Sequence, residues 1–578
     1  MIVEIAKKAV GNIKAGLVLT GLISFLGLVM IGSMLFSSGC QEITDRLHRY
    51  LDAAHEYWNF NGSVLIAWKG RIIVDKSYGM ANEIIGLPNT SQTKFFIGSI
   101  TKQFTAAAIM ILKEKQLINL DLPVSTYLPD FKNEYADKIT VRHLLTHSSG
   151  LPNYTEKMEF YLKRMLPFNP DELLKTIQDE ALVFEPGTGF LYSNTGYILL
   201  GAIIERVSGQ SYEAFLHKEI FKPLDMHNTG YGRREAGHPD RADGYTHDES
   251  GQLDAAVPIE FSFLHSAGAL YSTVEDLLKW DKALSAGRIL KPAAIKEMIS
   301  PRVDHYGYGW YVESRRGYIH TFHDGAIDGF NTIISRWPDV GLCIIVLSND
   351  DVAPVDKMAF GLADICFARE TDFPVKKTPY PLDEKYYDNY PGVYKSDDDR
   401  YWIIDFNHGE LSAGLLNQPK RRLIPQAIDT FFYAIDNTKT LNFHRDENRK
   451  IIAIEIIDGE NKILSRRLPE QDARKIRIDR TVAKIDADLL NRYIGRYLLE
   501  PALSSGGREF DLEVLASDEI IIAKISKTEA IELYPNSQNS FFHKNADWLL
   551  TFQIDNQGKV TGCILRIGLS QHIGRKID

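Results

Sequence analysis

The chain has 578 residues, 44% of them hydrophobic and 25% charged, which is typical of a globular protein with more than one domain. Its formal net charge of −10 argues against electrostatic binding of nucleic acid. We find neither the ligand spacing of a zinc finger nor a phosphate-binding loop, and therefore predict no metal and no cofactor.

The first forty residues differ in composition from the rest. Lysines precede an uncharged apolar run over residues 15–36, and small residues then precede Cys40. This order is typical of a secretory signal, and its end resembles the cleavage box of bacterial lipoproteins, in which Cys40 would be lipidated. The apolar run is also long enough to stay as a membrane anchor. Both alternatives predict an exported protein, tethered to the membrane on the periplasmic or surface side of the cell envelope.

A serine and a lysine follow in a pattern that suggests catalysis. Residues 63–68 and 71–75 are predicted to form a β-hairpin, and a buried helix is predicted to begin near Ser99. Ser99 and Lys102 are three residues apart and therefore share a face of that helix. A lysine amine held against a serine and shielded from water can lose its charge and take the serine proton. The pair predicts a serine nucleophile with a lysine base.

Three other residue patterns are interpreted as structural. A second Ser-x-x-Lys match, Ser91 with Lys94, follows loop-forming residues and is predicted to lie in a turn. His147 follows an apolar helix, among turn residues. It is a candidate general base, but we interpret it as a histidine that hydrogen-bonds within the fold. Cys343 lies in an apolar run and is predicted to be a buried core residue.

A turn rich in glycine and proline precedes Tyr192 and Asn194, and an apolar helix is predicted over residues 198–207. A tyrosine held near a lysine ammonium is expected to have a lowered pKa and can shuttle protons. An asparagine side chain can hold a substrate amide. In isolation, however, these residues are much more typical of an ordinary turn than of a site.

Beyond this turn, the pattern predicts a helix capped at Ser272, with Glu275 as the second half of a capping box. Alternating residues from 319 onward then predict successive antiparallel strands that end in the run around Cys343. The sequence contains no Gly-x-Ser-x-Gly elbow, which argues against an α/β-hydrolase.

In this order, the motifs Ser99-x-x-Lys102, Tyr192-Ser193-Asn194 and His323-Asp324-Gly325 resemble those of the class C β-lactamase and DD-peptidase family, with its related esterases and D-aminopeptidases. The likeness covers residues 43–369. It implies an α+β domain with a β-lactamase and penicillin-binding-protein fold, in which an antiparallel sheet has helices on both faces and a helical subdomain beside it.

The resemblance implies a role for each motif residue. Ser99 would be the acylated nucleophile, and Lys102 with Tyr192 would take its proton and pass it to the leaving group. Asn194 would orient the substrate. The backbone N–H groups of Ser99 and Ala326 would form the oxyanion hole.

The third motif departs from the β-lactamase pattern. His323 stands where β-lactamases have a lysine, as in the peptidase and esterase branches, and Gly325 ends the motif in the strand that would bind substrate. Asp324 stands where a threonine or serine commonly binds a free carboxylate. Its charge is expected to repel a carboxylate, partly offset by a protonated His323, and to favour a free ammonium. Alternatively, strand alternation turns Asp324 away from the pocket that His323 faces.

The remaining chain is predicted to be all β. A stiff linker over residues 370–384 precedes short strands, and the stretch from Asp388 to Tyr394 recurs as Asn491 to Tyr497. We predict two small β-barrels, at 385–480 and 484–578, an arrangement that resembles the D-aminopeptidases of the family. They either contribute to the active site or serve as spacers.

We therefore predict an exported serine hydrolase that cleaves an amide or ester through an acyl-enzyme on Ser99, with weak β-lactamase activity. Its substrate would be a small peptide, an ester or a fragment of peptidoglycan. One alternative is a D-aminopeptidase-type exopeptidase. A third reading, of another class, is a receptor that penicillin or a stem peptide acylates without turnover. Neither nucleic acid nor a cofactor is an expected partner.

Overall fold

The computed structural model describes most of the chain from residue 41 onward. The residues outside the description are 1–40, 157–173, 176, 179, 233–240, 248–251, 258, 408, 417, 419, 460, 477–481, 486, 501–509, 518, 526–530, 544–547, 556, 568–569 and 578. The apolar run and Cys40 are among them, so the lipid tether and the membrane anchor stay predictions. No helix within the described ranges combines the length and apolarity needed to cross a membrane.

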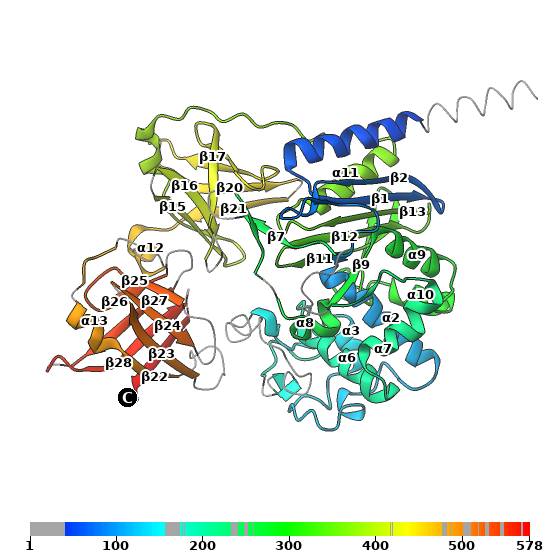
Figure 1. Ribbon diagram of the computed structural model, residues 1–578, viewed down its shortest axis with the longest axis horizontal. Helices are drawn as coiled ribbons and strands as arrows, with labels where there is room; N and C mark the ends of the chain where they lie inside the picture. The colour runs from blue at the N-terminus through cyan, green and yellow to red at the C-terminus, as the bar shows by residue number, and fades with distance from the viewer. Residues whose placement is uncertain are drawn as a thin grey trace, which may run out of the picture.

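The centre of the catalytic domain is a six-stranded antiparallel sheet with the order β10-β11-β12-β13-β1-β2 (Figure 1). Its strands are β1 (Gly62–Trp68), β2 (Arg71–Tyr78), β10 (Tyr311–Arg315), β11 (Tyr318–Ile327), β12 (Phe330–Trp337) and β13 (Leu342–Ser348). The predicted hairpin is confirmed as β1 and β2. Strand β1 also pairs with β13, so that Gly62 lies opposite Ser348.

Side chains alternate along β1, which places an apolar core on each face of the sheet. Val64 and Ile66 pack with the helix over residues 41–58 and with α11 (Val355–Cys366). Leu65 packs into a larger core on the opposite face, which includes the helical subdomain. Figure 1 shows the helix over 41–58 and α11 on one side of the sheet and α2, α6, α8 and α9 on the other side.

The helical subdomain surrounds α2 (Thr101–Glu114), whose first twelve residues are all buried. The other helices of this domain are α3 (Val141–Leu145), α6 (Asn194–Ser208), α7 (Tyr212–Leu216), α8 (Phe261–Gly268), α9 (Val274–Ser285) and α10 (Pro292–Met298). Short strands beside them are β3 (Met80–Asn82), β4 (Leu87–Pro88), β5 (Phe95–Phe96), β6 (Gly230–Tyr231), β7 (Tyr245–His247), β8 (Leu253–Ala255) and β9 (Leu270–Ser272).

The start of α9 corrects one prediction. Ser272 is not its cap, because this residue ends β9 and pairs with Phe95 of β5. The cap is Thr273, whose side chain accepts a hydrogen bond from the N–H of Asp276. The capping residue therefore lies one position later than predicted.

Two closed eight-stranded barrels follow, as predicted, and Figure 1 shows them to the left of the catalytic domain. The first contains β14 (Gly392–Ser396), β15 (Tyr401–Asn407), β16 (Glu410–Leu415), β17 (Arg421–Ala427), β18 (Thr430–Tyr433), β19 (Thr440–Arg445), β20 (Ile451–Asp458) and β21 (Asn461–Arg467). The second contains β22 (Gly495–Leu499), β23 (Phe510–Ser517), β24 (Ile520–Ile525), β25 (Ile531–Pro535), β26 (Ser540–Phe542), β27 (Trp548–Ile554), β28 (Val560–Ile567) and β29 (Ser570–Lys576). Helices α12 (Glu470–Ile476) and α13 (Ala487–Tyr493) lie between them.

The internal repeat has the same geometry in both barrels. The hydroxyl of Tyr394 donates a 2.8 Å hydrogen bond to the carbonyl of Tyr390, and the hydroxyl of Tyr497 donates one of the same length to the carbonyl of Tyr493. All four rings are buried in the barrel interiors. The repeat therefore encodes the same tyrosine hydrogen bond at the first strand of each barrel.

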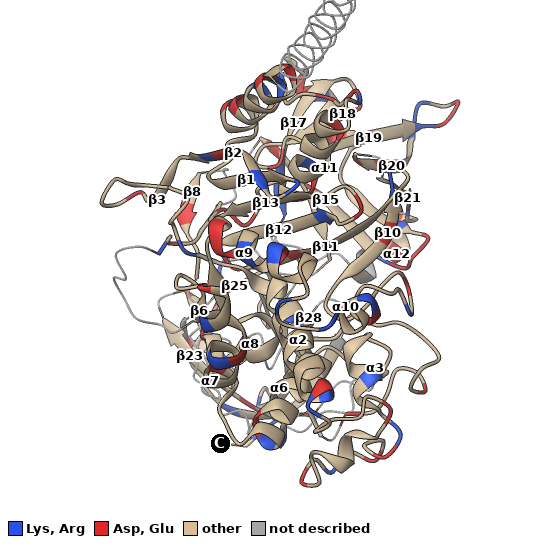
Figure 2. Cartoon of the chain, turned by 90° about the vertical axis from the view of Figure 1, so that its right-hand side faces the viewer, with Lys and Arg blue, Asp and Glu red and all other residues tan. Residues whose placement is uncertain are grey.

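The first barrel is docked on the catalytic domain. The amide nitrogen of Asn437 donates to the carbonyl of Tyr57 at 2.6 Å, and Arg421 donates to the carbonyl of His247 at 3.2 Å. Figure 2 shows Lys and Arg interspersed with Asp and Glu over the catalytic elements and the strands of this barrel. The two hydrogen bonds show that the first barrel borders the catalytic domain. They are made to the helix over 41–58 and to β7.

Candidate active site

Ser99 lies where the chain turns from β5 into the buried helix α2. Residues Gly98–Ile100 form a short 3-10 turn, and α2 starts directly afterwards at Thr101. The serine is therefore one turn earlier than the regular helix, and Lys102 is in the first turn of α2. Ser99 is partly exposed, whereas Lys102 is fully buried.

The Lys102 ammonium nitrogen has three oxygen partners. It lies 3.0 Å from Ser99 Oγ, 2.8 Å from Asn194 Oδ1 and 2.8 Å from the carbonyl oxygen of Ala267. Burial lowers the pKa of Lys102 to about 7, against the opposing attraction of Asp324. A substantial fraction of this amine is therefore uncharged at neutral pH and can accept the Ser99 proton.

Tyr192 lies close enough to Ser99 for the two side chains to interact. Its ring centroid lies 4.9 Å from Lys102 Nζ. The expectation of a lowered pKa is wrong: burial raises the pKa of Tyr192 well above its ordinary value, and the interaction with Ser99 opposes this rise only in part. Tyr192 is therefore protonated at neutral pH, and of these two groups only Lys102 has a pKa suited to accepting a proton.

Asn194 is the first residue of α6, so its side chain projects from a helix start into the site. Its Oδ1 accepts from Lys102, and its Nδ2 donates to Thr155 Oγ1 at 3.0 Å. Its backbone N–H donates to Asn153 Oδ1 at 3.2 Å. Asn153 and Thr155 were missed by sequence reasoning, since neither belongs to a motif.

The predicted oxyanion donors depend on a close approach between two backbones. A Cβ atom at Gly325 would lie 2.0 Å from the carbonyl oxygen of Ile97, and one at Gly98 would lie 3.0 Å from the nitrogen of Ala326. Gly98 also has a positive φ of 49°. Glycine at both positions therefore lets β11 lie directly beside Ser99.

The strand register explains where the Ala326 N–H points. Ile327 pairs with Phe330 across a two-residue turn, so alternate N–H groups place that of Ala326 on the edge facing away from β12. The neighbouring β10 ends its pairing where Tyr311 meets Phe322. The Ala326 N–H thus lies on an edge that β10 leaves open, on the side of Ser99.

His323 is buried and has partners for both ring nitrogens. Its Nδ1 lies 2.6 Å from the carbonyl oxygen of Asp324, and its Nε2 lies 2.8 Å from the hydroxyl of Tyr306. Burial lowers the pKa of His323 to about 4. It is therefore neutral, donates from Nδ1 and accepts from Tyr306. The expectation of a protonated His323 is wrong. Tyr306 is a third residue that sequence reasoning missed.

Asp324 follows the strand alternation and leaves the face that His323 occupies. Its side chain is 45% exposed, with Oδ1 3.9 Å from His323 Nδ1. Its charge still acts on the site, because it raises the pKa values of Lys102 and Tyr192. Asp324 is therefore a half-exposed acid at the edge of the site, within electrostatic reach of Lys102.

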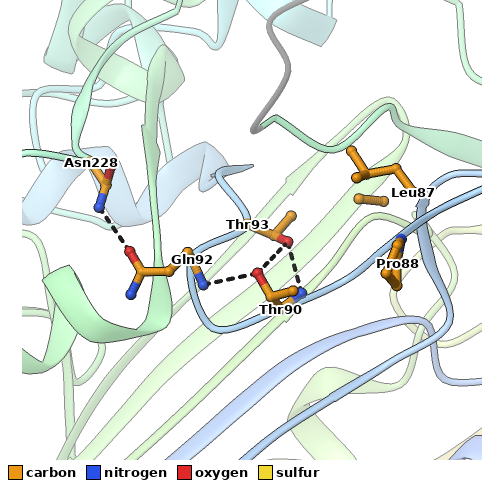
Figure 3. Close-up of a pocket in the computed structure, with 7 residues that line it drawn as sticks. Leu87, Pro88, Thr90, Gln92, Thr93 and Asn228 are labelled. Atoms are coloured by element: carbon orange, nitrogen blue, oxygen red, sulfur yellow. Dashed lines mark hydrogen bonds between the residues drawn. The ribbon is translucent and has the colours of Figure 1, made fainter.

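The second Ser-x-x-Lys match forms a turn, as predicted. Its neighbours line a pocket of about 290 Å³, where polar side chains bond to one another (Figure 3). The amide of Asn228 donates to Gln92 Oε1 at 3.1 Å, and the N–H of Thr90 donates to Thr93 Oγ1 at 2.8 Å. Within the described residues, no three His, Cys, Asp or Glu side chains are grouped closely enough to hold a metal ion.

Comparisons with known proteins agree with this geometry. A family model described as Beta-lactamase matches residues 47–365, which include every motif residue above. Penicillin-binding protein 4* of Bacillus subtilis (strain 168) is 29% identical over 418 residues, which are 67% of this chain and 90% of that protein. The octameric penicillin-binding protein homologue from Pyrococcus abyssi aligns with a TM-score of 0.52 and 27% identity, over 73% of this chain and 99% of that one.

Proposed function

Because this chain belongs to the beta-lactamase family, whose members are serine hydrolases, we propose that it cleaves an amide or ester bond through an acyl-enzyme on Ser99. The observation that carries the proposal is the buried Lys102 amine 3.0 Å from Ser99 Oγ. An envelope location is supported by the signal-like first forty residues and by the penicillin-binding names of its relatives.

The proposed reaction begins when uncharged Lys102 removes the Ser99 proton. Ser99 Oγ then attacks the substrate carbonyl, and the N–H groups of Ser99 and Ala326 stabilise the oxyanion. When the tetrahedral intermediate collapses, the bond to the leaving group breaks and that group needs a proton. Tyr192, which interacts with Ser99 and whose ring centroid lies 4.9 Å from Lys102 Nζ, would relay this proton from the Lys102 ammonium. A water molecule that gives a proton to Lys102 then attacks the acyl-enzyme carbonyl. The bond to Ser99 Oγ breaks, Ser99 takes this proton back, and the acid is released.

This mechanism predicts a pH profile set by Lys102. Since only the uncharged amine is a base and its pKa is about 7, kcat/KM on a neutral ester should rise tenfold per pH unit below that value and level off above it. The neighbouring His147 and His323 have lowered pKa values and stay neutral over this range. Initial rates from pH 5 to 9 measure the midpoint. A midpoint near 10 would contradict a neutral Lys102 as the base.

The alternative of a D-aminopeptidase is favoured by one feature, the half-exposed Asp324 near Lys102. A substrate carboxylate about 4 Å from the Asp324 carboxylate would be repelled by at most roughly 4 kcal/mol at an effective dielectric near 20. Solvent around the half-exposed Asp324 lowers this repulsion. A neutral His323 offers no positive charge to offset this repulsion. The same carboxylate would attract a substrate with a free ammonium group.

We therefore expect Asp324→Thr to raise kcat/KM on carboxylate-bearing β-lactams at least tenfold while changing little on neutral esters. The isosteric Asp324→Asn is the matched control, and both variants should shift the Lys102 midpoint to lower pH, because Asp324 raises that pKa. Efficient hydrolysis of β-lactams by the unmodified chain would show that Asp324 does not select by charge. Variants whose kcat/KM equals that of the unmodified chain on both β-lactams and esters would show the same.

A further inference from the structure

His147 is placed to hold the turn that carries Tyr192. It follows α3 with a positive φ of 54° and is buried. Its carbonyl accepts a 2.9 Å hydrogen bond from the N–H of Leu191, and its Nδ1 accepts a 3.1 Å hydrogen bond from the N–H of Ser193. The residues on both sides of Tyr192 are therefore tied to this one histidine.

The ring of His147 also packs against the catalytic tyrosine. Its centroid lies 4.3 Å from that of Tyr192, with an interplanar angle of 35°, and 4.6 Å from that of Tyr306. The Tyr192 ring therefore contacts both His147 and Lys102, whose Nζ is 4.9 Å from the Tyr192 centroid. The histidine is part of the buried surroundings of the phenol.

His147 occupies this position at a cost to stability. Because Nδ1 accepts from Ser193 and the ring is neutral, Nε2 carries the proton, yet buried Nε2 has no hydrogen-bond partner among the described residues. A buried donor without a partner and a left-handed backbone at a non-glycine residue both disfavour the folded state. Such a combination points to a role beyond packing.

The same cluster continues to the strand of the oxyanion hole. Tyr306, in ring contact with His147, donates from its hydroxyl to His323 Nε2 at 2.8 Å. His323 in turn donates to the carbonyl of Asp324 at 2.6 Å, two residues before Ala326. One chain of contacts therefore joins the tyrosine on the base side to the strand on the oxyanion side.

We propose that His147 is a positioning residue for hydrolysis: it fixes the Tyr192 phenol relative to Ser99 by holding the backbone on both sides of Tyr192, without touching the substrate. The inference rests on the proposed hydrolase function. It names a residue outside the three motifs whose loss should slow the chemical step more than it weakens substrate binding.

The test compares His147→Ala with two other variants on p-nitrophenyl butyrate. We expect His147→Ala to lower kcat at least tenfold with KM within about twofold, and to shift the pH midpoint upward because water reaches Lys102. His147→Asn should recover most of the lost kcat, since asparagine tolerates a left-handed backbone and its Oδ1 can accept from Ser193. His320→Ala is the control. His320 is equally buried and hydrogen-bonds to Glu313 and Ser335, which belong to none of the motifs.

Thermal unfolding and acylation by fluorescent penicillin are measured alongside. A His147→Ala variant that only melts earlier, as His320→Ala should, with unchanged kcat and pH midpoint, overturns the inference. If His147→Ala does not fold, His147→Gln replaces it, since its amide extends past the Nδ1 position. If the wild-type chain is acylated but hydrolyses no substrate, the hydrolase proposal fails, and the rate of acylation tests the inference instead. Slower acylation of the His147→Asn variant than of the His320→Ala variant would then contradict the expected rescue. A chain that neither turns over nor is acylated overturns both.

Discussion

Replacing Ser99 with alanine is expected to lower kcat on esters and amides by about 10⁶, the loss typical when a serine hydrolase is deprived of its nucleophile. Without Oγ, no acyl-enzyme can form, although Lys102 and the backbone N–H groups of residues 99 and 326 remain. Covalent labelling by a fluorescent penicillin should disappear together with turnover. Melting temperature should change little, because Ser99 is only partly buried.

Ser91→Ala is the matched control, since Ser91 also has a lysine three residues later but lies in a turn. It should keep both labelling and turnover. The same experiment separates an enzyme from a receptor. A wild-type chain that is labelled once at Ser99, keeps the label for hours and hydrolyses no substrate would support the receptor. Activity that survives Ser99→Ala would exclude this serine as the nucleophile.

Gly325→Ala is expected to lower kcat at least a hundredfold, which is the typical effect of losing one oxyanion donor. The added methyl group would lie 2.0 Å from the carbonyl oxygen of Ile97 and 2.7 Å from Thr332 Oγ1, so β11 must move away from the turn that carries Ser99. The N–H groups of Ser99 and Ala326 would then no longer meet at one oxygen. Because the proposed donors would bind the transition state more strongly than the substrate, KM should change far less than kcat.

Gly317→Ala is the control for this variant. Gly317 lies in the turn before the same strand with a φ of 83°, but a Cβ there meets nothing within 4 Å. It should therefore lose stability from backbone strain while keeping kcat. If thermal unfolding shows both variants folded and Gly325→Ala retains full kcat, the close approach of β11 is not needed to align the donors.

The Ser99 and Lys102 pair was predictable because three-residue spacing on a helix brings two side chains together, and the structure joins them at 3.0 Å. The barrels were predictable for a similar reason, since each strand pairs with its neighbour in the sequence and the Tyr-x-x-x-Tyr repeat marks each start. Ser272 was assigned as a cap from its local pattern alone. Ser272 pairs with Phe95, which is far away in the chain, and therefore belongs to strand β9.

The electrostatics of the site were less predictable, because burial is set by elements distant in sequence. The pKa of Tyr192 was expected to fall beside a charged lysine. In the fold, His147 and Tyr306 pack against the phenol and its burial raises the pKa, and the charge of Asp324 adds to this rise. His323 was expected to be protonated, but Tyr306 and the carbonyl of Asp324 enclose it. Tyr306 comes from a loop with no motif, which is why sequence reasoning missed it.

The pairing of β1 with β13 has a consequence for the order in which this protein can fold. Gly62 faces Ser348 on one edge of β1 and Tyr78 of β2 on the other, so β1 can pair with β2 early, while its second edge stays open until β13 has been synthesised. Contacts between such distant segments form slowly, whereas each barrel closes over a much shorter stretch, as from residue 392 to 467 in the first. The catalytic domain is therefore most prone to aggregate while it is still being synthesised. A chain that stops before β13 lacks the strand that joins β12 to β1 in the middle of the sheet.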